Sequence, residues 1–204
     1  MSKASSINCS FAISNLEDTK QKVLNWAKRF GTFCFLDNHQ YPSPSHSVEC
    51  MLAAGTKRTL NASAGNALGQ LQKFIGEKPG WLFGHFGYDL KNEIEALVSA
   101  HPDAVAFPDL FFFEPEVLIR LNETAMIIES DEAENIFEEI NNENKIPGHR
   151  TNPDVFIQNR FSKEEYIAAI EQLRQHILRG DCYEINFCQE FYAENCEIDP
   201  LDIY

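Results

Sequence analysis

The segment from Gly180 to Phe191 has the clearest potential for chemistry. Its side chains alternate as they do along a β-strand, yet Asn186 and Gln189 place amide groups where a plain core strand would be apolar. We interpret the segment as a strand that lines a ligand pocket, with Asn186 and Gln189 as candidate binding residues. The alternative is a half-buried antiparallel strand with one face in water.

The remaining sequence shows no familiar catalytic arrangement. It has no Ser-His-Asp order, no phosphate-binding loop and no dinucleotide fingerprint. The six cysteines form no Cys-x-x-Cys pair, and the six histidines are scattered without metal-ligand spacing. We therefore predict no catalytic residue and no metal site in these 204 residues. We expect the cysteines to be reduced and mostly buried.

Helical and extended patterns must position the candidate strand. Ser162-Lys163-Glu164-Glu165 has capping-box spacing, and an apolar stripe then runs to Gly180, a residue typical of a helix end. Upstream, we predict a strand over 81–90, in which Gly84 and Gly87 indicate close backbone approach. We also predict two hairpins, 48–54 with 59–62 and 117–121 with 125–128.

The order of these elements predicts fold class and domains. Short strands mix with helices without strict alternation, which indicates an α+β fold with layered antiparallel sheets and flanking helices. The polar stretch 141–154 contains Asn, Pro and Gly and predicts a boundary. We therefore expect one domain over 1–150 and the start of a second over 151–204.

Composition limits the partners. The net charge of −14 disfavours nucleic acid and anionic membranes, and no apolar run reaches the length of a membrane span. The first residues do not form a signal peptide, so we expect a cytoplasmic protein. The hydrophobic fraction of 44% is enough for a sizeable core.

Three segments share their pattern with a known family. Gly180 to Phe191 keeps a pattern of Gly, Asp, Tyr, Asn, Gln and Phe, and departs from it at Glu184, Cys188 and Glu190. Gly80 to Asp89 and Phe107 to Phe113 match two further family segments in the same order. Together they resemble the chorismate-utilising enzymes, which include the large subunits of anthranilate synthase and aminodeoxychorismate synthase.

The resemblance implies a fold, a reaction and partners. The fold would be an incomplete version of the chorismate-binding enzyme sandwich, with a domain like that of anthranilate synthase component I over 1–150. The reaction would be amination of chorismate, using Mg²⁺ held by residues outside this chain and ammonia from a glutamine amidotransferase subunit. The chain by itself would be inactive, as an N-terminal part of the enzyme.

Three functions stay open at this point. The amino-acid sequence of the Gly180 segment is closer to that of aminodeoxychorismate synthase component I, whose product 4-amino-4-deoxychorismate leads to para-aminobenzoate and folate. The first alternative is anthranilate synthase component I. The second is a non-catalytic binding or interaction module.

A second candidate pocket follows from the resemblance. Leu36, Asp37 and Asn38 resemble part of the family's Leu-Leu-Glu-Ser motif, which contributes to a tryptophan site, and Ser47 matches its second element. These four residues are therefore a candidate effector pocket, with tryptophan as its candidate ligand. The alternative is that Asp37 and Asn38 only form an Asx-type turn. This alternative is favoured because Glu49 would repel the carboxylate of a bound amino acid.

Overall fold

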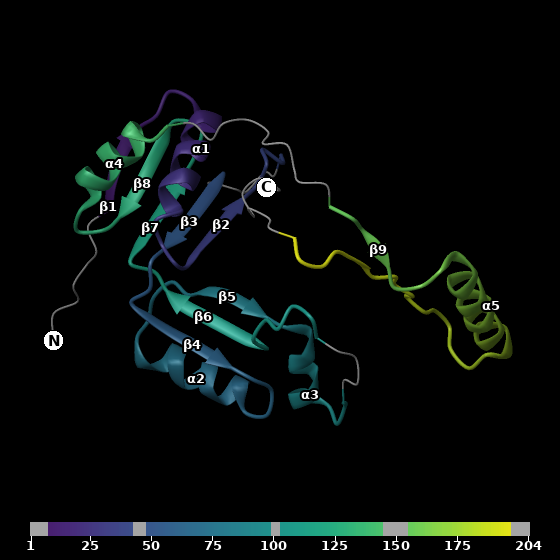
Figure 1. Ribbon diagram of the computed structural model, residues 1–204. Coiled ribbons are helices and arrows are strands. Elements are labelled where there is room, and N and C mark those ends of the chain that lie inside the picture. Colours follow the sequence, from purple (N-terminus) through teal and green to yellow (C-terminus); the bar gives the residue numbers. More distant parts are fainter. Residues whose placement is uncertain (1–7, 43–47, 99–102, 145–154, 197–204) are drawn as a thin grey trace. The chain divides into compact units, whose positions relative to one another are not determined.

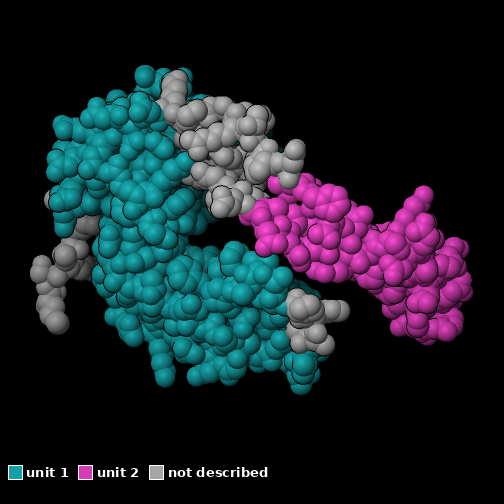
Figure 2. Space-filling view, viewed as in Figure 1, with its two compact units in different colours: residues 1–146 teal, residues 147–204 magenta. Residues whose placement is uncertain are grey.

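The computed structural model describes residues 8–42, 48–98, 103–144 and 155–196. The chain divides into two compact units, unit 1 with residues 1–146 and unit 2 with residues 147–204 (Figures 1 and 2). Unit 1 combines several helices with antiparallel strands, and the described part of unit 2 combines one helix with two antiparallel strands, so the predicted α+β class is confirmed. The assignment of residues 1–150 and 151–204 to two family domains stays a prediction.

A five-stranded antiparallel sheet forms the centre of unit 1. Its order is β1-β8-β7-β3-β2, and Asn8 at the start of the unit pairs with Glu129 near its end. The predicted hairpin of 117–121 with 125–128 is confirmed, and Asn122 Oδ1 accepts hydrogen bonds from the backbone of Thr124 and Ala125 in its turn. The strands are β1 (Asn8–Ala12), β2 (Phe33–Asp37), β3 (Cys50–Ala54), β7 (Val117–Leu121) and β8 (Ala125–Glu129).

Two helices cover one face of this sheet, α1 (Leu16–Ala27) and α4 (Ala133–Asn142) (Figure 1). They close the main core, in which Val23, Trp26, Ile119 and Ile140 are almost completely buried. The α1 residues in this core lie three and four positions apart, so they share one face of the helix. Burial of this apolar surface is the main stabilising contribution to unit 1.

A three-stranded sheet with order β4-β6-β5 forms the other part of unit 1. Here the predicted hairpin of 48–54 with 59–62 is wrong, since β4 pairs with β6 and β3 pairs with β2 and β7. The predicted strand over 81–90 is shorter and gives way to a 3₁₀ turn, η1. The bounds are β4 (Arg58–Ala62), β5 (Phe83–Phe86), β6 (Leu110–Glu114), α2 (Ala67–Glu77), η1 (Tyr88–Leu90) and α3 (Lys91–Ile94).

The expected close approach at Gly84 is confirmed. A Cβ atom on Gly84 would overlap the carbonyl oxygen of Phe111 and lie 2.7 Å from Phe112 Cα on the neighbouring strand. His85 packs beside the same strand, and its Nε2 lies 3.0 Å from the carbonyl oxygen of Pro108. Glycine at 84 therefore lets β5 lie close against β6.

Unit 2 contains one long helix, α5 (Lys163–Arg179), and a two-stranded ribbon of β9 (Gln158–Asn159) and β10 (Phe191–Tyr192). The predicted capping box is confirmed, because Ser162 and Glu165 exchange side-chain to backbone hydrogen bonds. Gly180 ends the helix with a left-handed backbone, φ 83°. No residue of α5 is buried.

Candidate functional site

The candidate effector pocket lies at the end of β2, where Leu36 and Asp37 point to opposite faces of the sheet. Leu36 is 54% exposed. The Asp37 carboxylate points toward α1, and its Oδ1 lies 2.9 Å from Lys20 Nζ, with both side chains less than a tenth exposed. Lys20 Nζ also lies 3.2 Å from Glu17 Oε1. Asp37 is thus neutralised by a lysine of the same unit.

Asn38 continues this site as a turn. Asp37 Oδ1 accepts a hydrogen bond from the backbone N–H of His39 at 2.8 Å, which is the expected Asx-type turn. Asn38 Nδ2 donates to the carbonyl oxygen of Tyr41 and to the carboxylate of Glu49, which is itself buried. Ser47, the fourth candidate residue, lies outside the described residues. The three described candidates therefore make internal contacts within unit 1.

Sequence reasoning missed Lys20, although its position gave a signal. Lys20 comes three and four residues before Val23 and Leu24, so it lies on the apolar stripe of α1. Burial by itself would lower the pKa of Lys20, but the hydrogen bonds from its ammonium to Asp37 and Glu17 outweigh burial and raise it. A lysine on the buried face of a helix requires such a carboxylate partner.

The expectation of mostly buried cysteines is wrong. All six are free thiols, but only Cys50 is buried, and Cys188 is exposed. Burial, followed by the nearby Asp37 carboxylate, raises the pKa of the Cys50 thiol far above its ordinary value. Since the thiolate is the reactive form, Cys50 must be a poor nucleophile in the folded protein.

We expect iodoacetamide to alkylate Cys188 in the folded protein while Cys50 stays unmodified at mildly alkaline pH. Peptide mapping by mass spectrometry after timed exposure measures both positions. The same reaction in urea is the control, because unfolding removes the burial that protects Cys50. Equal alkylation rates for the two thiols in the folded protein would contradict this result.

The ligand pocket predicted from the segment Gly180 to Phe191 belongs to unit 2, and the strand predicted for that segment is wrong. Between Gly180 and Cys196, where the described residues end, only Phe191 and Tyr192 form a strand, and they pair with the two residues of β9. Asn186 is exposed and Gln189 is partly buried, both in irregular backbone. Among the described residues of unit 2, this segment has no partner strand longer than the two residues of β9. Alternation of side chains by itself cannot form a sheet without such a partner.

Phe187 and Glu190 connect the segment to the rest of unit 2. The Phe187 ring lies 5.7 Å from Phe161 and 5.4 Å from Tyr166, the latter on α5. Glu190 forms an exposed ion pair with Arg160, 2.8 Å between Oε2 and Nε. Among the described residues, the structure shows no side-chain hydrogen bond that would orient Asn186 and Gln189 as a pair.

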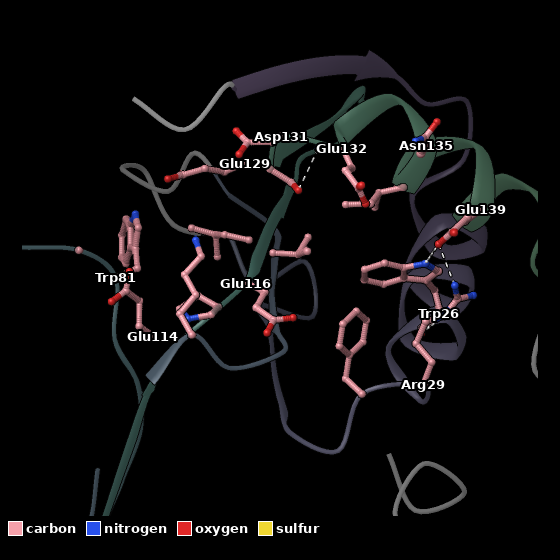
Figure 3. Close-up of a pocket in the computed structure, with 18 of the residues that line it drawn as sticks. Trp26, Arg29, Trp81, Glu114, Glu116, Glu129, Asp131, Glu132, Asn135 and Glu139 are labelled. Atoms are coloured by element: carbon pink, nitrogen blue, oxygen red, sulfur yellow. Dashed lines mark hydrogen bonds and ion pairs between the residues drawn. The ribbon is translucent and has the colours of Figure 1, made fainter. Parts of the chain in front are cut away.

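A half-open cavity of about 770 Å³ lies in unit 1 (Figure 3). Aromatic rings form part of its wall, and carboxylates outnumber cations by six to three. Sequence patterns did not indicate it, because its residues come from distant segments. The charged and aromatic lining residues are Trp26, Arg29, Phe30, Lys57, Lys78, Trp81, Glu114, Glu116, Glu129, Asp131, Glu132 and Glu139.

Two lining carboxylates of this cavity already hold cations of the protein. Glu139 Oε2 lies 2.7 Å from Arg29 Nη1 and accepts the indole N–H of Trp26, also at 2.7 Å. Glu114 bonds to Arg58 and Lys78, each at 2.7 Å. Burial pushes the pKa of Glu114 up, but these two cations outweigh it and hold the pKa below its usual value.

Metal binding does not fit the described part of the chain. No group of three or more His, Cys, Asp or Glu side chains within it is placed to hold a metal ion. We therefore assign no Mg²⁺ ligand to these residues and derive no step through the ion. Among the described residues, no helix has the length and apolar character needed to cross a bilayer.

Comparison with known sequences identifies the class. A sequence model described as chorismate binding enzyme matches residues 26–204. This match spans most of the chain and includes all three segments that carried the resemblance. The chain belongs to the chorismate-binding enzyme family.

Two relatives of the chain are both named anthranilate synthase component 1. The chain is 29% identical to the Thermus thermophilus protein over 118 residues, which cover 52% of this chain and 26% of that relative. It is 23% identical to the Cereibacter sphaeroides protein over 145 residues, which cover 60% and 29%. The chain thus spans between a quarter and a third of the length of these curated relatives.

Proposed function

We propose that this chain is part of an enzyme that aminates chorismate, using ammonia delivered by a glutamine amidotransferase subunit. The observation that carries the proposal is the family match over residues 26–204. Two relatives named anthranilate synthase component 1 support anthranilate as the product. Mg²⁺ enters the proposal through the family resemblance alone.

A second candidate product, 4-amino-4-deoxychorismate, is favoured by one observation in unit 1. Asp37 stands where the resemblance places the acidic residue of a tryptophan site, and Lys20 already neutralises it at 2.9 Å. An effector ammonium group would have to compete with this intramolecular pair. A chain in which this pair excludes tryptophan would fit an enzyme of para-aminobenzoate and folate synthesis better than one that feeds tryptophan synthesis.

Disrupting the gene in its own organism tests the proposal and separates the two products. We expect the disrupted strain to require tryptophan if the product is anthranilate, and para-aminobenzoate if it is 4-amino-4-deoxychorismate. Extracts supplied with chorismate, ammonium and Mg²⁺ should lose the corresponding activity. A strain carrying the restored gene is the control.

The proposal is overturned if the disrupted strain needs neither supplement and its extracts keep both activities. A requirement for both supplements would support chorismate amination and reject a single product. The non-catalytic alternative predicts growth without either compound.

A further inference from the structure

The carboxylates of the unit 1 cavity exceed the cations that face them. Within the described residues, Arg29 is held by Glu139 and Glu143, and Lys78 is held by Glu114. The structure shows no ion pair for Glu116, Asp131 or Glu132 among these residues. Lys57 is the remaining lining cation, and its side chain is exposed. The cavity therefore keeps an excess of negative charge.

The helix dipole explains only part of this excess. Asp131 and Glu132 precede α4, where negative charge is favourable. However, the Glu132 side chain makes no capping hydrogen bond. Glu116 lies on the turn between β6 and β7, so it has no helix terminus to stabilise. In Figure 3, Glu116 lies between the two tryptophans, and Asp131 and Glu132 lie along the opposite edge.

Aromatic side chains line the cavity together with the carboxylates. Trp26 and Phe30 form one wall, with ring centroids 4.9 Å apart, and Trp81 on another segment is 51% exposed. An aromatic face beside carboxylates favours a cation with an apolar body, because the ring and the carboxylate both attract positive charge.

The protein itself holds guanidinium groups in this way at two places next to the cavity. The Arg29 guanidinium lies over the Trp26 ring at 5.3 Å and bonds to Glu139. The Arg58 guanidinium lies over Phe74 at 4.1 Å and bonds to Glu114. Both intramolecular examples combine an aromatic ring with carboxylates, which is also what Trp81 and the unpaired carboxylates offer.

We propose that this cavity binds a small organic cation, a protonated amine or a guanidinium compound with a flat apolar body. The cation lies against Trp81, and Glu116, Asp131 and Glu132 neutralise it. The volume of about 770 Å³ is within the range of small-molecule sites. The proposal is independent of the chorismate reaction, because it concerns binding in unit 1 alone.

Titration of the full chain with benzylammonium, followed by NMR, tests the proposal. Trp26 and Trp81 are the only tryptophans, so each indole N–H signal reports one wall. We expect a saturable shift of the Trp81 signal with benzylammonium, and binding at least tenfold weaker for benzyl alcohol, which has the same shape without the charge. Equal binding of the neutral compound would overturn the proposal.

A matched pair of triple variants locates the site. Glu116→Gln/Asp131→Asn/Glu132→Gln should weaken benzylammonium binding at least tenfold. Glu95→Gln/Glu123→Gln/Glu138→Gln removes the same charge from exposed positions outside the cavity and should weaken it less than threefold. Circular dichroism checks that both variants fold. The proposal fails if the two triple variants weaken binding equally, or if the Trp81 signal does not shift in the unmodified chain.

Discussion

Replacing Lys20 with methionine is expected to lower the free energy of unfolding of unit 1 by about 3 kcal/mol. Methionine fills similar space but leaves the buried Asp37 carboxylate without the ammonium that neutralises it at 2.9 Å. Removing one partner of a buried ion pair costs more than the pair contributes, because the other charge stays away from water. Urea unfolding followed by the fluorescence of Trp26 and Trp81 measures the loss.

Two variants control this measurement. Lys73→Met changes an exposed lysine of α2 and should alter stability by less than about 0.5 kcal/mol. Asp37→Asn, added to Lys20→Met, should recover part of the loss because it removes the buried negative charge. If the single variant is no less stable than Lys73→Met, or the double variant recovers nothing, the pair does not act as described.

The pH dependence of the Lys20 effect has a definite sign. The folded-state pKa of Lys20 is raised above its ordinary value. The stabilisation is therefore complete below the unfolded-state pKa and is lost as the pH rises through the folded-state pKa. The stability difference between the unmodified chain and Lys20→Met should stay constant near neutrality and shrink only in strongly alkaline buffer.

Substitution of Gly84 by alanine is the second change with a large expected effect. The new Cβ would overlap the carbonyl oxygen of Phe111 and lie 2.8 Å from its carbonyl carbon. Backbone atoms of a paired strand cannot rotate away as a side chain can, so β5 and β6 must separate locally. We expect a loss of about 3 kcal/mol, at the upper end for overpacking, in the same urea experiment.

Gly80→Ala is the matched control, because a Cβ at Gly80 has no atom within 4 Å. It should change stability by less than about 0.5 kcal/mol. A Gly84→Ala variant as stable as Gly80→Ala would show that the two strands are not held so close together. Amide hydrogen exchange in β5 gives a second measurement, since separated strands lose protection.

Local features of the fold could be predicted from sequence because local chemistry determines them. Ser162 and Glu165 cap α5, Gly180 ends it, and the hairpin of 117–121 with 125–128 forms as expected. The close approach at Gly84 was predictable for the same reason, since only glycine lacks the Cβ that would clash. Each of these features involves residues within a few positions or a single steric requirement.

Strand pairing could not be predicted from sequence in the same way. Alternation shows that a segment suits a sheet, but it does not name the partner, so β4 was assigned to β3 when it pairs with β6. The segment from Gly180 to Phe191 has the alternation without a long partner among the described residues, and only its end is a strand. Pairing depends on contacts between distant parts of the chain.

The candidate sites show the same limit. Asp37 and Asn38 were correctly read as capable of an Asx-type turn, which is a local property. The Lys20 partner of Asp37 lies on another element, and the unit 1 cavity collects residues from α1, several turns and α4. A charge that a motif seems to offer to a ligand can be neutralised by a distant residue, which only the folded structure reveals.

The pairing of β1 with β8 affects how unit 1 is made in the cell. Asn8 emerges from the ribosome well before Glu129 and cannot pair with it until almost the whole of unit 1 has been synthesised. Until then, the apolar side chains of β1, Cys9 and Phe11, stay exposed to water. Such long-range closure slows folding and exposes nascent chains to aggregation. Slower translation would prolong this exposure, and chaperones that hold extended segments would then protect β1.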